Sequence, residues 1–310
     1  MSKNQQLDQC IGNYRLLRLL SRSHTAEIYL AEHTLFHTEA VIKLLDKQRT
    51  DNDVEKFLAQ ASLLAHLHHP NIVQVLDFGM EEETAFLIMN YAANGTLRQR
   101  YPKGTRLPLP LILHYTRQIA SALHYTHQHH LIHRDIKPHN MLLGTHDDVM
   151  LTDFGIAVVA QDFTAEVPAF RDFEGTVLYA APEQLQGKPH QTSDLYALGI
   201  IVYEWLCGEW PFTGSFDEVA HQHLFVSPPS FSEKHVEVPP AFEQVIRKAL
   251  AKEPAQRFSD VEDFMCALEQ AYQPLSQPDS VPEIALKISS RRQFMSPLPF
   301  SGETIIKQVG

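Results

Sequence analysis

Two kinds of hydrophobic pattern divide the chain. Between residues 14 and 91, short apolar runs alternate with polar turns, which is typical of strands. These runs cover residues 14–20, 27–31, 40–45, 72–78 and 84–89. Residues 54–66 follow a helical period instead, with Phe57, Ala61 and Leu64 on one face. The pattern therefore predicts a strand-rich lobe, residues 14–91, that contains one main helix.

The pattern changes after Gly95 and becomes helical. Helical stripes cover residues 111–127, 192–206, 242–252 and 260–272. Asp260 is a suitable N-cap for the last helix, and Pro254 is expected to end the one before it. The prediction is an α+β fold with two lobes, in which a larger, mostly helical lobe spans residues 92–272.

The two ends of the chain differ from its centre. Residues 1–13 form a short and mostly polar N-terminal extension. From residue 273 to residue 310 prolines and serines accumulate and no hydrophobic period persists, which is typical of a flexible tail.

Composition narrows the classes of partner and compartment. A hydrophobic fraction of 44% over 310 residues supports a sizeable core, and a formal net charge of −11 argues against nucleic acid as a partner. The longest uncharged apolar run, residues 195–203, is too short to cross a membrane. Cys10, Cys207 and Cys266 are widely separated, so neither a disulfide framework nor a cysteine zinc site is expected. We expect a cytoplasmic protein without a membrane span.

Histidine is unusually frequent, with eighteen copies. Several lie close together, namely His66, His68, His69, His124, His127, His129, His130 and His133. A metal site is one interpretation, but the spacings lack the flanking carboxylates or cysteines of common ligand sets. The interpretation we favour is that these side chains pack on half-exposed surfaces.

The strongest chemical signal is the run His133-Arg134-Asp135-Ile136-Lys137-Pro138-His139-Asn140, followed thirteen residues later by Asp153-Phe154-Gly155. Phosphoryl transfer needs a carboxylate beside the attacking hydroxyl, a cation on the transferred phosphate, and oxygen ligands for magnesium. This run offers all three. Over residues 14–272 the chain resembles the serine/threonine protein kinases of the bacterial eukaryotic-like type.

The resemblance implies a role for each matching residue of the larger lobe. Asp135 would accept the proton of the substrate hydroxyl, and Lys137 would hold the γ-phosphate of ATP. Asn140 and Asp153 would bind Mg²⁺, or Mn²⁺ in its place. Glu183 of Ala181-Pro182-Glu183 would pair with Arg257, and Asp194 would steady the catalytic loop. Those last three residues are expected to be scaffold.

The resemblance also implies a nucleotide site in the smaller lobe. Lys43, which ends Ala40-Val41-Ile42-Lys43, would contact the α- and β-phosphates. Met89 would lie at the gate of the adenine pocket, with Tyr91 and Ala92 in the hinge. The phosphate-covering loop and the strand after it would supply Ser21, Ser23, Ala26 and Ile28.

Two departures from the kinase pattern favour an attenuated enzyme. The loop reads Ser21-Arg22-Ser23-His24-Thr25-Ala26 and has none of the expected glycines, and a non-glycine residue with positive φ costs about 1–2 kcal/mol. Weaker nucleotide binding is therefore expected. Gln60 stands where the family has a glutamate that pairs with the strand lysine, and we expect its amide to accept a hydrogen bond from Lys43 instead.

The segment between the two halves of the site is also unusual. Thr164 is the only hydroxyl-bearing residue of residues 156–174. Glu166, Asp172 and Glu174 lie where the family commonly has a phosphothreonine that engages the residue matching Arg134. We hypothesise that these acidic residues partly replace that phosphate.

Three functions remain open at this point. The resemblance favours an ATP- and magnesium-dependent serine/threonine kinase with protein substrates, acting in signalling, and self-association for autophosphorylation is open. The alternative is a pseudokinase-like scaffold that binds nucleotide or a partner, as Gln60 and the glycine-free loop suggest. A small-molecule kinase of related fold is the third, but the Ala181-Pro182-Glu183 segment points to protein substrates. The sequence does not name the substrate, the upstream signal or the role of the tail.

Overall fold

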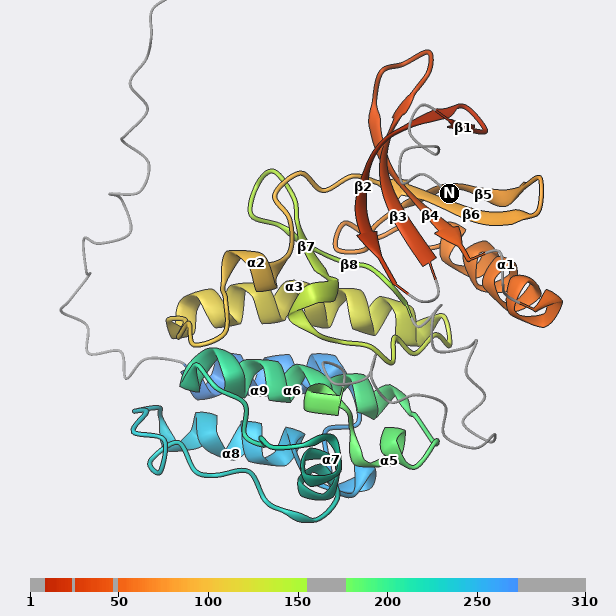
Figure 1. Ribbon diagram of the computed structural model, residues 1–310. Helices are drawn as coiled ribbons and strands as arrows, with labels where there is room; N and C mark the ends of the chain where they lie inside the picture. Colours follow the sequence, from red (N-terminus) through yellow and green to blue (C-terminus); the bar gives the residue numbers. More distant parts are fainter. Residues whose placement is uncertain (1–8, 24–25, 47–49, 155–176, 273–310) are drawn as a thin grey trace, which may run out of the picture. The chain divides into compact units, whose positions relative to one another are not determined.

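The computed structural model describes residues 9–23, 26–46, 50–154 and 177–272. Its first part is an antiparallel six-stranded sheet with the order β1-β2-β3-β4-β6-β5 (Figure 1). The strands are β1 (Cys10–Ile11), β2 (Tyr14–Arg22), β3 (Ala26–His33), β4 (Glu39–Leu45), β5 (Val75–Glu81) and β6 (Thr84–Asn90). All five predicted strands are present. The fourth predicted segment, residues 72–78, is paired as β5 only from Val75, because Val73 and Asn71 bond to the backbone of Leu151 in the other lobe.

Helix α1 (Asp51–Ala65) begins three residues before the predicted helix. Thr50 explains the earlier start, since its side chain accepts a hydrogen bond from the Asp53 N–H and its own N–H donates to the Asp53 carboxylate. The helix buries Phe57, Ala61 and Leu64, the stripe expected from the sequence. It packs against β5 and β6.

The second lobe is mostly helical, so the predicted two-lobed α+β fold is confirmed. Its α-helices are α2 (Leu97–Arg100), α3 (Leu109–Gln128), α5 (Pro182–Leu185), α6 (Gln191–Cys207), α7 (Phe216–Phe225), α8 (Pro240–Ala249) and α9 (Val261–Tyr272). The remaining elements are the 3₁₀ turns η1 (Pro138–Asn140), η3 (Val177–Tyr179) and η4 (Pro254–Gln256) and the hairpin β7 (Met141–Leu143) and β8 (Val149–Leu151). Among the helices described, none is both long and apolar enough to span a membrane.

Helix α6 forms the centre of this lobe, with α3, α8 and α9 packed around it (Figure 1). Every residue from Ser193 to Cys207 is buried, which suits a helix that is apolar on nearly all sides. The helix ends at Gly208, whose φ of 77° is the left-handed conformation that glycine adopts most easily. This rigid centre carries Asp194 in its first turn.

One of the two predicted helix signals needs correction. Pro254 does not end α8, which stops at Ala249; the proline begins η4 instead. Asp260 does precede α9 as expected, and its carboxylate accepts the backbone N–H of Glu262 at 2.6 Å.

Candidate active site

The catalytic loop, residues 133–140, follows α3 and is held in place by hydrogen bonds to Asp194 of α6. One carboxylate oxygen of Asp194 accepts the backbone N–H of Arg134 at 2.8 Å. The other accepts the N–H of His133 at 2.9 Å and contacts His127 Nε2 at 2.8 Å. These bonds hold Arg134 at a φ of 67°, a conformation that costs a non-glycine residue free energy unless its surroundings enforce it. The loop is therefore rigid where Asp135 leaves it.

Asp135, Lys137 and Asn140 form a compact polar cluster on this loop. Lys137 Nζ lies 2.9 Å from Asp135 Oδ2, and Asn140 Nδ2 donates to the same oxygen at 2.8 Å and to the Asp135 carbonyl at 2.9 Å. The turn η1 places the three side chains together, because it folds Asn140 back toward Asp135. The structure thus brings the three predicted catalytic residues together.

Lys43 reaches across from β4 to Asp153, which follows β8. Its Nζ lies 2.7 Å from Asp153 Oδ1, and the lysine side chain is only 9% exposed. Burial opposes ionisation of Asp153, but the charge and hydrogen bond of Lys43 outweigh it and lower the pKa of this carboxyl. Asp153 is therefore a carboxylate at neutral pH, held by a cation from the other lobe.

His133 supports this arrangement from inside the lobe. Its Nε2 contacts the Thr152 carbonyl at 3.0 Å, and its Nδ1 accepts the Asp135 N–H at 3.3 Å. Burial lowers the pKa of His133, so the ring is neutral with its proton on Nε2. The ring also packs against Phe154, with the ring centroids 4.4 Å apart and the ring planes tilted by 40°. A single buried histidine thus joins the catalytic loop to the strand end that carries Asp153.

A cavity of about 570 Å³ opens between the sheet and the hairpin of β7 and β8. Seven of the predicted site residues line it, namely Ser21, Ile28, Met89, Tyr91, Ala92, Asn140 and Asp153. Lys43 is not among the lining residues, but its partner Asp153 is. Ser23, Ala26, Asp135 and Lys137 also lie outside the lining.

Sequence reasoning missed several lining residues. Val41 and Leu142 supply apolar surface from β4 and β7, and Gln99 and His139 supply polar groups from α2 and η1. A signal existed for Val41, since it lies two residues before Lys43 and alternation along a strand puts both side chains on the same face. For Leu142 and Gln99 we find no comparable signal in the sequence.

The phosphate-covering loop is closed by Ser23. The Ser23 N–H donates to the Ala26 carbonyl at 2.9 Å, and the Ala26 N–H donates to Ser23 Oγ at 3.1 Å. None of Ser21, Ser23 and Ala26 has a positive φ, so the expected strain of a glycine-free loop is not found at these three positions. The amides of Ser23 and Ala26 are used inside the hairpin, which is a different reason to expect weaker phosphate binding. His24 and Thr25 lie outside the described residues.

The expectation for Gln60 is wrong. Its amide does not accept a hydrogen bond from Lys43, and in the part of the chain that the structure describes Gln60 Oε1 is buried without a partner. The reason is electrostatic, because a lysine ammonium bonds more strongly to a carboxylate than to a neutral amide. Asp153 offers the carboxylate.

The predicted scaffold pair is present. Arg257 makes two bonds of 2.7 Å to the two oxygens of Glu183, and both side chains are buried. Burial raises the pKa of Glu183, but its bonds to Arg257 and Ser193 outweigh this and lower it. The pair ties the Ala181-Pro182-Glu183 segment to the loop before α9.

Several predictions fall outside the described residues. They concern the glycine of Asp153-Phe154-Gly155, the hydroxyl and acidic residues of residues 156–174, and the tail. The residues are Gly155, Thr164, Glu166, Asp172, Glu174 and residues 273–310. These remain predictions.

Comparison with known proteins identifies the family. The model of the protein kinase domain matches residues 14–273. The chain is 35% identical over 265 residues to the serine/threonine-protein kinase PrkC of Bacillus subtilis (strain 168), covering 84% of this chain and 41% of PrkC. It is also 35% identical over 281 residues to the serine/threonine-protein kinase PknF of Mycobacterium tuberculosis (strain ATCC 25618 / H37Rv), covering 86% of this chain and 58% of PknF.

A third relative is the probable serine/threonine-protein kinase PknB of Lactococcus lactis subsp. lactis (strain IL1403), 35% identical over 257 residues, which are 81% of this chain and 41% of that protein. The chain thus spans about two fifths of the length of PrkC and of this relative. The matched residues include the whole of the site described above. The chain belongs to the protein kinase family.

Proposed function

We propose that this chain is a serine/threonine protein kinase, with its kinase domain at residues 14–272, and that it transfers the γ-phosphate of ATP to protein hydroxyls. The observation that carries the proposal is the pairing of Lys43 with Asp153 at the edge of one cavity, together with the cluster of Asp135, Lys137 and Asn140. A cation for phosphate, two oxygen ligands for metal and a carboxylate base meet there.

In this proposal Asp135 orients the acceptor hydroxyl and takes its proton. The hydroxyl oxygen forms a bond to the γ-phosphorus as the bond from that phosphorus to the β-phosphate oxygen breaks, so ADP leaves and the proton ends on Asp135. Lys137, 2.9 Å from Asp135 Oδ2, supplies positive charge where the transferred phosphoryl group passes. The double hold of Asn140 on Asp135 keeps the carboxylate in place.

The donor set fits a hard divalent cation, Mg²⁺ or Mn²⁺. The side-chain N–H groups of Asn140 donate to Asp135, so Asn140 Oδ1 is left for a metal. At Asp153, Lys43 contacts only Oδ1, so the second carboxylate oxygen is left as well. Carboxylate and amide oxygens are ligands that such ions prefer. When bound, the ion would neutralise charge on the phosphate oxygens.

The apolar part of the cavity suits adenine. Ile28 and Val41 from the sheet and Leu142 from the opposite side offer flat apolar walls, and Tyr91 and Ala92 follow β6 at the hinge. Met89 lies next to this hinge and is buried.

Two features support an attenuated rate. Gln60 has no charge that would draw Lys43 away from Asp153. The Ser23 N–H donates to the Ala26 carbonyl and the Ala26 N–H donates to Ser23 Oγ, so neither amide is left to bind phosphate. The same two observations favour the second candidate, a pseudokinase-like scaffold that binds nucleotide or a partner with little transfer.

We further propose a cytoplasmic location, since Cys10, Cys207 and Cys266 are all free thiols and the reaction consumes ATP. The partners we propose are protein substrates with serine or threonine acceptors. Self-association for autophosphorylation is part of the proposal, and mixing active chain with the Asp135→Asn variant tests it.

Transfer of labelled phosphate from ATP with Mg²⁺, to the chain itself and to a generic basic protein, separates the two candidates. The kinase proposal expects phosphoserine or phosphothreonine from the native chain and none from Asp135→Asn. Nucleotide binding without any transfer by the native chain would support the scaffold instead.

A further inference from the structure

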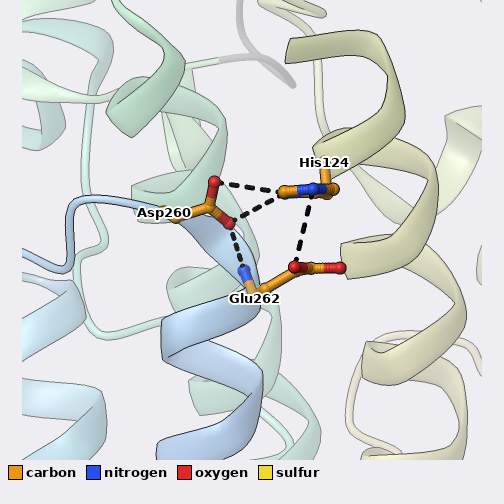
Figure 2. Close-up of side chains that lie close together, drawn as sticks. All are labelled: His124, Asp260 and Glu262. Carbon is orange, nitrogen blue, oxygen red and sulfur yellow. Dashed lines mark hydrogen bonds and ion pairs between the residues drawn. The ribbon is translucent and has the colours of Figure 1, made fainter. Parts of the chain in front are cut away.

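Helices α3 and α9 run antiparallel and are joined by two polar contacts. Near the end of α9, Glu269 pairs with Arg117 of α3, with Arg117 Nη2 at 2.7 Å from Glu269 Oε1. Seven residues further along α3 lies His124, and seven residues back along α9 lies Glu262. At this second contact His124 faces two carboxylates, those of Asp260 and Glu262 (Figure 2).

The geometry at His124 is compact. Its Nδ1 lies 3.1 Å from each oxygen of Asp260, and its Nε2 lies 3.5 Å from Glu262 Oε2. One ligand atom from each of the three residues lies within 4.8 Å of the others. Imidazole nitrogens and carboxylate oxygens that bind one ion at about 2.0–2.2 Å lie at most about 4.4 Å apart, so the three groups would draw slightly closer around an ion.

The charges at the two contacts differ. Glu269 has an arginine partner, whereas no lysine or arginine pairs with Asp260 or Glu262 among the residues that the structure describes. Capping of α9 accounts for the position of one Asp260 oxygen, which accepts the Glu262 N–H. It does not account for the Glu262 carboxylate lying beside His124. Asp260 and Glu262 thus place two carboxylates around one imidazole, and a divalent cation bound among them would offset their negative charge.

A residue outside the cluster orients the ring. The side-chain amide of Gln128, one turn along α3, lies 2.6 Å from His124 Nε2. The nitrogen and oxygen of such an amide are assigned from their contacts, so Gln128 can present its oxygen to an Nε2–H group. Metal-bound histidines are commonly held in this way through their second nitrogen, which leaves Nδ1 for the ion.

We propose that His124 Nδ1, Asp260 and Glu262 bind a divalent transition ion of the Zn²⁺ type, with water completing its coordination. Asp260 already faces Nδ1, whereas Glu262 lies on the Nε2 side, and its side chain, 59% exposed, would rotate to reach the same ion. Imidazole ligation favours zinc-like ions over Mg²⁺, so this site is separate in place and in selectivity from the one at Asn140 and Asp153. The site does not depend on the proposed kinase activity.

The ion would join α3, which leads into the catalytic loop, to the last helix of the domain.

The test measures Zn²⁺ affinity by competition with a chromophoric chelator, and Co²⁺ absorption as a report on coordination. It uses the full chain without an affinity tag, stripped with a chelator and kept in millimolar Mg²⁺ to fill the catalytic site. The variants are His124→Ala, Glu262→Gln and Gln128→Ala, with Glu269→Gln and His114→Ala as controls on the same two helices.

We expect one tight Zn²⁺ equivalent in the native chain and in both controls. The equivalent is lost in His124→Ala, weakened at least about tenfold in Glu262→Gln, and weakened about tenfold or more in Gln128→Ala, the range for outer partners of metal ligands. Circular dichroism checks that His124→Ala is folded, and Glu262→Gln alters only an exposed side chain. Equal Zn²⁺ binding by the native chain, His124→Ala and Glu262→Gln, or no tight equivalent at all, overturns the proposal.

Discussion

The side chain that pairs with Lys43 determines how Asp153 is placed in the candidate active site. A buried ammonium needs a strong acceptor, and Asp153 supplies a carboxylate at 2.7 Å whereas Gln60 offers only an amide oxygen that stays without a partner in the described structure. Lys43 therefore holds Oδ1 of Asp153 and weakens the negative charge that the other oxygen of this carboxylate would offer a metal. A glutamate at position 60 would give Lys43 a second carboxylate and leave Asp153 to the metal.

Gln60→Glu is accordingly expected to raise the rate of phosphate transfer about tenfold, which corresponds to about 1.4 kcal/mol of transition-state stabilisation. The measurement is kcat with ATP and Mg²⁺ on a fixed protein substrate. Ala59→Glu adds the same charge at the neighbouring, exposed position of α1 and should leave kcat unchanged. A rate that stays the same or falls in Gln60→Glu would show that Lys43 is not limited by its partner.

Ser23 offers a second prediction for a single residue. Ser23→Gly removes the hydroxyl that occupies the Ala26 amide, so this N–H can turn to phosphate. A hydrogen bond to a charged group contributes about 1.5–3 kcal/mol, so the Kd for ATP should fall about tenfold. Ser23→Thr keeps the hydroxyl and should keep the native Kd. Nucleotide titration followed by fluorescence or calorimetry gives both values, and weaker binding by Ser23→Gly would contradict this account.

At the scale of single residues, the sequence selected Asp135, Lys137 and Asn140 because phosphoryl transfer calls for a carboxylate, a cation and an oxygen ligand. The structure places the three side chains in contact, and their catalytic roles stay predictions. The pairing of Lys43 could not be found, because it depends on distances between two lobes that no local pattern encodes.

Between elements, the buried pair of Glu183 and Arg257 joins α5 to the loop before α9. Removing one partner of such a pair leaves the other charge buried and typically costs about 3–5 kcal/mol. Glu183→Gln should therefore lower the free energy of unfolding by about this amount, measured by urea denaturation near neutral pH. The exposed pair of Arg247 and Glu243 on α8 is the control, and Arg247→Gln should cost about 0.5 kcal/mol or less.

The pH dependence of that loss has a definite sign. The pKa of Glu183 is lower in the folded chain than its ordinary value of 4.5, so its contribution is fully present above pH 4.5 and is lost as pH falls through the lower folded value. The difference in unfolding free energy between native chain and Glu183→Gln should shrink below pH 4.5. A difference that is constant or grows on acidification would mean that Glu183 is not ionised in this pair.

Element prediction succeeded where the hydrophobic period was strong and failed where tertiary contacts decide. The stripe of α3 and the apolar run of α6 gave their helices within two residues. Helix α7 was missed because only Val219 and His223 of its ten residues are buried, too few to show a period. Its start was nevertheless readable at Ser215 and Glu218, which form a capping box.

Over the whole molecule, one cavity gathers groups from both lobes, so nucleotide should stabilise the folded chain. A ligand at 100 times its Kd adds about 2.7 kcal/mol to the free energy of unfolding. A non-hydrolysable ATP analogue with Mg²⁺ should therefore raise Tm in the native chain and much less in Lys43→Met, which lacks the cation between the lobes. An equal rise in Lys43→Met would place the nucleotide elsewhere.

The two-lobed architecture was predictable because strand-like and helical periods occupy separate halves of the chain. The contacts that join the two lobes were less predictable. Val73 and Asn71 bond to the backbone of Leu151 in the other lobe, so the predicted strand begins later than expected.

The central claim is that Asp135 acts in transfer whereas Asp153 acts in holding the metal and nucleotide. The most direct test measures, in one preparation of each chain, both the Kd for ATP with Mg²⁺ and the single-turnover rate of phosphate transfer. We expect Asp135→Asn to keep the native Kd and lose transfer by at least about a hundredfold, the contribution typical of a general base. Asp153→Asn should lose both. Native transfer rates in Asp135→Asn, or no transfer by the native chain despite measurable nucleotide binding, would contradict the account.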